Sequence, residues 1–111
     1  MNTTITERDL TGYVRDLART FGWLRYHTWS SQHSPAGFPD EVLVRAPRLI
    51  FAELKSETGR LRPEQETWLE ALRAVPGLEV YMWRPADMDA IAEVLRPDGR
   101  RRRAGGGLIW T

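Results

Sequence analysis

Two carboxylates and one amine are spaced so that they could surround a divalent cation. Asp40 follows a proline at the start of one apolar run, and Glu53 and Lys55 lie two residues apart in the next. Side chains two apart on a strand point to the same face of a sheet. If the runs form a hairpin about Ala46-Pro47-Arg48, the midpoint of positions 40 and 53 falls in the turn. Asp40 then opposes the region of Glu53.

Such a cluster favours phosphate chemistry. Neighbouring carboxylates repel each other, and Mg²⁺, which prefers oxygen ligands, removes that repulsion. A bound metal ion polarises a phosphoryl oxygen and lowers the pKa of a bound water, and Lys55 could position that water or neutralise developing charge. Lys55 is the single lysine among sixteen basic residues. A plainer interpretation also stands, because alternating acids and bases on a strand often form a solvated face with cross-strand ion pairs.

The elements that must position these residues follow from periodicity and from turn signals. The order is α-β-β-β-α-β-α: helix 7–21, strand 23–29, a loop, strands 41–45 and 49–55, a helix opening at Pro63, strand 78–83 and helix 86–95. This order predicts a single-domain α/β fold with a small mixed sheet flanked by helices. A right-handed crossover places strand 78–83 parallel to strand 49–55.

Composition limits the classes of protein that fit. A chain of 111 residues without cysteine is expected to form one domain, with no disulfide and no thiolate metal site. No apolar run approaches a membrane span and the N-terminus has no signal-peptide core, so we expect a cytoplasmic protein. Residues 1–96 are the predicted domain and residues 97–111 a basic, glycine-rich tail. Without the four tail arginines, 12 basic residues face 15 acidic ones.

The motifs, taken in order, resemble a known family. Asp40 followed by Glu53-Leu54-Lys55 resembles the PD-(D/E)xK nuclease core, and the longer pattern resembles a VRR-NUC domain from about Glu7 to Leu95. The segments that carry the second resemblance are Gly37-Phe38-Pro39-Asp40, Phe51-Ala52-Glu53-Leu54-Lys55-Ser56, Gly59-Arg60-Leu61-Arg62-Pro63-Glu64-Gln65 and Val80-Tyr81-Met82-Trp83-Arg84-Pro85-Ala86-Asp87.

The resemblance assigns roles to the cluster. It implies that Asp40 and Glu53 hold Mg²⁺ or Mn²⁺, that the backbone carbonyl of Leu54 adds a ligand, and that Lys55 is the catalytic lysine. The fold it implies is the restriction-endonuclease-like one. The activity it implies is metal-dependent hydrolysis of DNA phosphodiesters.

Three further positions have two readings each. The resemblance implies that Gln65 packs against the site, although a residue three places into a helix could simply cap it. It implies that Glu7 approaches the metal, although Glu7 could only complement the helix dipole. Glu41 departs from the family, which often has an apolar residue there. If alternation points Glu41 outward the site survives, whereas a register slip of one residue would exchange Glu41 for Asp40.

Several residues are candidates for contact with nucleic acid or for plain structural roles. The tail arginines are either phosphate-binding or a solvated end, and Leu108, Ile109 and Trp110 could instead dock on a second subunit. Trp23, Trp29, Trp68 and Trp83 are expected in the core. The nucleic-acid candidates are Ser31, His33, Arg60, Arg62, Arg100, Arg101, Arg102 and Arg103.

The function expected from these features is a metal-dependent endodeoxyribonuclease that is specific for DNA structure. Small stand-alone proteins of this kind resemble enzymes that cut branched DNA, including Holliday junction resolvases, and a phage origin suits the small size. Paired cuts in a symmetric junction would require a homodimer, since one short chain carries one site. Two alternatives stay open: nicking, flap or end processing with the same chemistry, and a non-catalytic nucleic-acid-binding or assembly protein on a nuclease fold.

Overall fold

A computed structural model describes residues 4–29 and 33–99 of the chain. Within these residues the four strands form one sheet in the order β1-β2-β3-β4, so β1 and β4 are its edges. The strands are β1 (Leu24–His27), β2 (Glu41–Arg45), β3 (Arg48–Leu54) and β4 (Glu79–Trp83). The helices are α1 (Glu7–Thr20), α2 (Pro63–Arg73) and α3 (Met88–Leu95), with a short 3₁₀ turn η1 (Pro85–Asp87) before α3.

The predicted order of elements is confirmed, as are the pairing directions. β2 and β3 are antiparallel and pair Glu41 with Ala52, which places the hairpin turn where the midpoint of positions 40 and 53 predicted it. β4 runs parallel to β3 and pairs Met82 with Glu53. The differences lie at element ends, where β1 stops at His27 rather than at residue 29.

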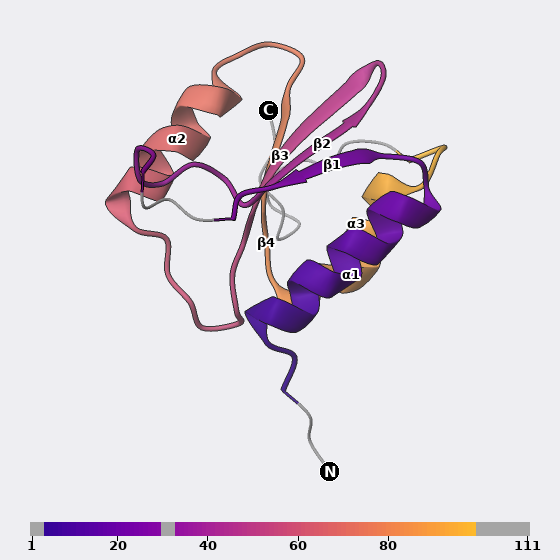
Figure 1. Cartoon of the computed structure of the whole chain (residues 1–111), viewed down its shortest axis with the longest axis horizontal. Helices are drawn as coiled ribbons and strands as arrows, with labels where there is room; N and C mark the ends of the chain where they lie inside the picture. The colour runs from indigo at the N-terminus through magenta and orange to yellow at the C-terminus, as the bar shows by residue number, and fades with distance from the viewer. Residues whose placement is uncertain (1–3, 30–32, 100–111) are drawn as a thin grey trace.

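The sheet separates two layers of helices (Figure 1). α1 and α3 lie on one face and α2 lies on the other. α1 starts where Thr6 caps it, because the Thr6 hydroxyl accepts the Asp9 N–H and the Asp9 carboxylate accepts the Thr6 N–H. Its buried stripe packs with α3 against the sheet, and this cluster includes Leu10, Val14, Ala18, Leu43, Ile50, Ala52, Tyr81, Ile91 and Leu95.

The tryptophans do not all belong to this core. Trp23 and Trp83 are buried as predicted, and Trp68 is half-buried, with its ring edge-on to Phe38. The expectation for Trp29 is wrong, because this side chain is 93% exposed. The reason is that β1 ends at His27, so residue 29 has already left the sheet. Trp110 lies outside the described residues.

Candidate active site

Asp40 is fixed at the start of β2 by backbone contacts from two neighbouring strands. Its Oδ2 accepts the N–H of Leu54 at 2.9 Å, which ties it to the end of β3 beside Glu53. The N–H of Thr28 donates to the Asp40 carbonyl at 2.9 Å, and the Thr28 hydroxyl donates to the carbonyl of Pro39 at 2.8 Å. The end of β1 therefore holds the Pro-Asp dipeptide in place.

Gln65 joins α2 to Glu53 and also caps its own helix. Its Nε2 donates to Glu53 Oε2 at 2.8 Å, while its Oε1 accepts the N–H of Arg62 at 2.8 Å. Gln65 therefore both caps α2 and contacts Glu53. The cap fixes the amide orientation, so that its N–H₂ group points at the Glu53 carboxylate.

Glu53 is a buried carboxyl group with one oxygen that lacks a hydrogen-bond partner among the described residues, called here the unmet oxygen. Its Oε1 is inaccessible to solvent and, in the ionised form, has no hydrogen-bond partner in the described chain. Burial, then the nearby Asp40 charge and a hydrogen bond between the two carboxyl groups, together raise the pKa of Glu53 to about 8. Lys55 opposes this rise in pKa. A cation between the two carboxylates would replace the proton.

Lys55 lies next to this pair. Its Nζ is 3.8 Å from Glu53 Oε2, and its side chain is 11% exposed. Its backbone N–H donates to the Trp83 carbonyl at 2.9 Å, which continues the β3–β4 pairing by one residue. The ammonium is therefore held beside the carboxylates by a rigid sheet.

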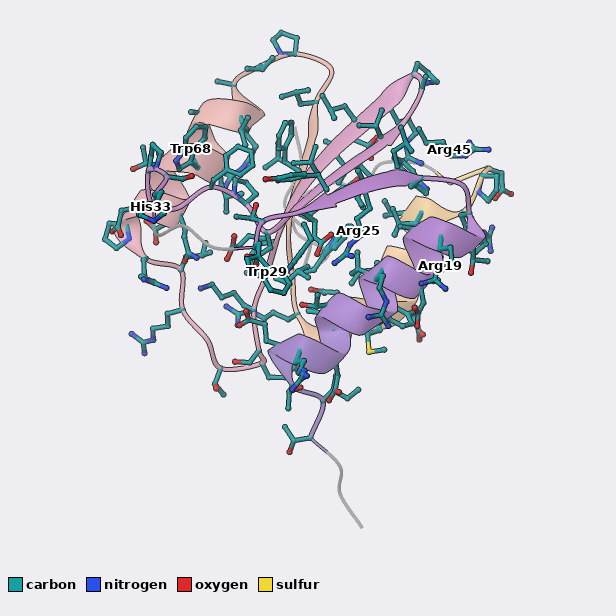
Figure 2. All side chains as sticks on the ribbon, in the orientation of Figure 1. Arg19, Arg25, Trp29, His33, Arg45 and Trp68 are labelled. Atoms are coloured by element: carbon teal, nitrogen blue, oxygen red, sulfur yellow. The ribbon has the colours of Figure 1, made fainter. Side chains whose placement is uncertain are left out.

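Glu41 occupies the opposite face from Asp40, so the register-slip reading is not realised. Alternation turns Glu41 away from Asp40, as the first reading required, but toward the buried side of the sheet rather than toward solvent, since its side chain is fully buried. Nε and Nη2 of Arg25 donate to the two Glu41 oxygens at 2.6 and 2.9 Å, and His27 Nδ1 lies 2.7 Å from Oε2. Figure 2 shows Arg25 on the α1 side of β1. These contacts fix Glu41 on one face of the sheet, and because neighbouring residues of a strand point to opposite faces, Asp40 lies on the face of Glu53.

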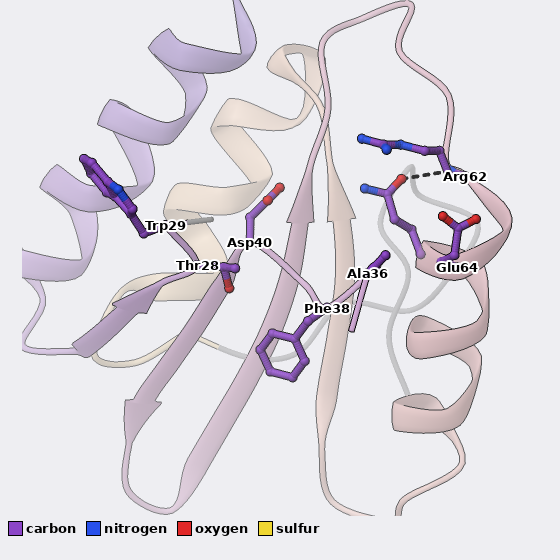
Figure 3. Close-up of a pocket in the computed structure, with 9 residues that line it drawn as sticks. Thr28, Trp29, Ala36, Phe38, Asp40, Arg62 and Glu64 are labelled. Carbon is purple, nitrogen blue, oxygen red and sulfur yellow. Dashed lines mark hydrogen bonds between the residues drawn. The ribbon is translucent and has the colours of Figure 1, made fainter. Parts of the chain in front are cut away.

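A pocket of about 190 Å³ opens beside Asp40 (Figure 3). Gly37 in its wall has φ +97°, and a Cβ there would lie 2.5 Å from the Glu64 backbone, so only glycine lets the loop approach α2 so closely. Phe38 anchors the same loop between Phe51 and Trp68. The residues that line the pocket are Thr28, Trp29, Ala36, Gly37, Phe38, Asp40, Arg62, Glu64 and Gln65.

The remaining candidate residues differ in their distance from the pocket and in whether the structure describes them. Arg62 is exposed and lines the pocket, whereas Arg60 and His33 are exposed and do not. Glu7 is exposed on the first turn of α1, and its charge contributes to the raised pKa of Glu53 after burial and Asp40. Ser31, Arg100, Arg101, Arg102 and Arg103 lie outside the described residues.

The residues present fit a divalent cation with an incomplete protein shell. Asp40 and Glu53 are carboxylates, and the unmet Glu53 oxygen is the kind of ligand that Mg²⁺ or Mn²⁺ takes. The Leu54 carbonyl as a further ligand stays a prediction. Across residues 4–29 and 33–99, no three His, Cys, Asp or Glu side chains gather closely enough to hold a metal ion. Such an ion would thus keep water and phosphate oxygens among its ligands, as Mg²⁺ usually does.

Comparison with known families agrees with this geometry. The model of the VRR-NUC domain matches residues 13–85, about two thirds of the chain. The chain therefore belongs to the VRR-NUC family, whose domain is one of the PD-(D/E)xK nuclease superfamily, and its function is nuclease-like. No curated protein matches the sequence. None of the helices in the described segments is sufficiently long and apolar to cross a bilayer.

Three contributors to the site were missed at the level of sequence. Thr28 holds the Asp40 backbone, Arg25 neutralises Glu41, and Trp29 borders the pocket. Alternation along β1 offered one signal for the partners of Glu41, because Arg25 and His27, two residues apart, share a face of the strand. Nothing local distinguishes Thr28 from any other strand-end threonine.

Proposed function

We propose that this protein is a divalent-metal-dependent endodeoxyribonuclease that hydrolyses phosphodiester bonds in branched DNA. The observation that carries the proposal is the buried, unmet oxygen of Glu53 beside Asp40, with the Lys55 ammonium 3.8 Å from the same carboxylate. A structural ion pair would leave no such oxygen. Burying the Glu53 oxygen costs desolvation free energy, and a bound cation and phosphate would offset that cost.

Each residue has a distinct task in this proposal. Asp40, Glu53 and the Leu54 carbonyl hold Mg²⁺ or Mn²⁺, which polarises the scissile phosphate and acidifies water when bound. Lys55 positions the attacking water and offsets the negative charge that develops on phosphorus. Gln65 keeps the Glu53 carboxylate oriented. Glu7 adds negative potential from α1.

The preference for branched DNA and the paired cuts are the finer part of the proposal. Two strands of a junction need two sites, so the active form is a homodimer that acts in the cytoplasm on DNA. Arg62 lines the pocket, and in this proposal it contacts a phosphate. Arg60, His33, Ser31 and the tail arginines extend that contact.

The experiment is a cleavage panel with end-labelled single strand, linear duplex, flap and four-way junction, each with Mg²⁺, Mn²⁺ or EDTA. We expect metal-dependent cleavage that is fastest on the branched substrates. Lys55→Ala abolishes cleavage and keeps a native circular dichroism spectrum. Arg15→Ala, which removes one positive charge from the exposed face of α1, is the matched control and cuts at the parental rate.

Cleavage that is equally fast with EDTA would contradict the metal role. Cleavage of linear duplex at the junction rate would remove the branched-DNA preference and leave the chemistry. Binding without cleavage on every substrate and metal would instead support a non-catalytic nucleic-acid-binding protein.

A further inference from the structure

Trp29 is a large aromatic side chain on the surface, next to the site. It is 93% exposed, the highest value among the large hydrophobic side chains of the described residues. It is also one of the residues that line the Asp40 pocket. Exposing an indole to water is unfavourable in the free protein, so a ligand that covers it gains the free energy of burying that surface.

The position of Trp29 relative to the catalytic carboxylate is set by the fold. Its neighbour Thr28 bonds to the carbonyls of both Pro39 and Asp40. These two bonds fix the backbone immediately before Trp29 against the backbone of Asp40. In the view of Figure 3, the indole of Trp29 and the guanidinium of Arg62 flank the Asp40 carboxylate on opposite sides.

The chemistry of the flanking groups identifies what they contact. Arg62 offers a charge to a phosphate, whereas Trp29 offers an apolar π-face that a charged phosphate does not match. Nucleobases match it, because every base has a π-face and stacks on aromatic side chains. Bases inside a duplex are already stacked on both sides, so the base that reaches Trp29 is unpaired.

We propose that Trp29 stacks on an unpaired nucleobase next to the phosphodiester held at Asp40 and Glu53, and thereby selects DNA with single-stranded character at the cut. The inference rests on the proposed function for the identity of the ligand. It adds the feature of the substrate that Trp29 recognises, which is an unstacked base at a branch point or in a single strand. Arg62 holds the backbone on the other side of the carboxylate.

The test measures binding separately from cleavage. All proteins carry Lys55→Ala so that DNA stays intact, and fluorescence anisotropy gives Kd for a labelled single strand of about 12 nucleotides. The same strand with abasic sites at its centre, and a duplex of equal length, are the comparison ligands. Leu24→Ala is the matched control, since it removes a 76%-exposed apolar side chain of β1 that does not line the pocket.

We expect Trp29→Ala to weaken binding of the single strand by about 5- to 150-fold, the range for loss of one base–aromatic stack. Trp29→Phe restores most of this affinity, because a phenyl ring also stacks. Binding of the abasic strand and of the duplex changes by less than about twofold in both variants, as does binding of every ligand by Leu24→Ala.

Equal losses for the intact and abasic strands would overturn the proposal, because Trp29 would then contact the backbone. Unchanged single-strand affinity in Trp29→Ala would overturn it too, as would a change of oligomeric state in sedimentation, which would make Trp29 a subunit contact. Failure of the proposed function is distinct from these results. A parent protein that binds through Trp29 yet never cuts DNA leaves the stacking intact and refutes the nuclease.

Discussion

On the face of the sheet covered by α1 and α3, Glu41 and Glu79 are buried with all their carboxylate oxygens bonded, whereas Glu53 on the α2 face is buried with one oxygen unbonded. Arg25 donates hydrogen bonds to both Glu41 oxygens through two nitrogens. Arg48 does the same for Glu79, with Nε and Nη2 each 2.7 Å from one oxygen. Glu53 contacts the neutral amide of Gln65, a more distant lysine and a second carboxyl group, Asp40, but no arginine within the described residues.

The two Arg–Glu pairs show what a structural buried carboxylate requires in this fold. Bidentate pairing compensates desolvation on the α1–α3 face, and the Tyr81 hydroxyl adds a further bond to Glu79 at 2.8 Å. The α2 face lacks such compensation at Glu53, and a raised pKa is the consequence. The difference indicates that Glu53 is placed for a ligand and the other two glutamates for the fold.

The largest expected effect is on catalysis. Glu53→Gln keeps the shape and the bond to Gln65 but removes the charge that a metal ion needs, so cleavage falls by more than about 1,000-fold. Single-turnover cleavage of labelled junction DNA with saturating Mn²⁺ measures this loss. Glu66→Gln, an exposed change on α2, serves as control and keeps full activity. A Glu53→Gln enzyme within tenfold of the parent would place the metal elsewhere.

The same substitution on the other face has its effect on folding. Glu41→Gln leaves the Arg25 guanidinium without its buried carboxylate, and breaking such a pair lowers the free energy of unfolding by about 3–5 kcal/mol. Urea denaturation followed by circular dichroism gives the value. A loss below about 1 kcal/mol would mean that Arg25 reaches solvent at little cost and that the pair does not hold the register.

A smaller effect is expected at Gln65, which orients Glu53 without charge. Gln65→Leu raises the Mn²⁺ concentration for half-maximal cleavage by about 10- to 100-fold, as for other residues that orient a metal ligand. Because Gln65 also caps α2, circular dichroism must first show that the helix is retained. Gln65→Glu separates the two roles, since it can still cap α2 but repels Glu53. Metal dependence equal to the parent in Gln65→Leu would reduce Gln65 to a cap.

The smallest effect is a pH-dependent difference in stability between the metal-free parent and Glu53→Gln. The folded parent binds the Glu53 proton more tightly than the unfolded chain does, with a pKa of about 8 against 4.5. The stabilising contribution of that proton is therefore complete below pH 4.5 and is lost as pH rises toward 8. Glu53→Gln, which cannot titrate, therefore gains stability relative to the parent as pH rises across this window.

Thermal unfolding of both proteins at half-unit steps of pH, in EDTA, measures this difference. Subtraction removes the titration of all groups that the two proteins share. A flat difference between pH 4.5 and 8 would show that Glu53 ionises as easily as an exposed glutamate, and the contrast between the faces would fail. Added Mn²⁺ should stabilise the parent more at the upper end of the window, because the ion replaces the proton.

The local sequence pattern was enough to predict most of the helices and strands. The period of α1, the proline that opens α2 and the hairpin midpoint predicted the elements and the pairing of β2 with β3, since helix and strand periodicity depend on neighbours in sequence. The same arithmetic predicted that Asp40 and Glu53 meet. Trp29 shows the limit: its aromatic type favoured a strand, but only the end of β1 at His27 decides that it is exposed.

The spacing of residues along the chain was enough to predict that two carboxylates lie thirteen residues apart across a hairpin, with a lysine two residues beyond the second, and hence the class of chemistry. Tertiary structure alone decided that Glu41 and Glu79 find arginines while Glu53 does not, because those partners come from β1 and β3 and their distances depend on packing. It also decided that Gln65 reaches Glu53 from α2. Desolvation and charge pairing are properties of the assembled layers, and no stretch of the chain carries them alone.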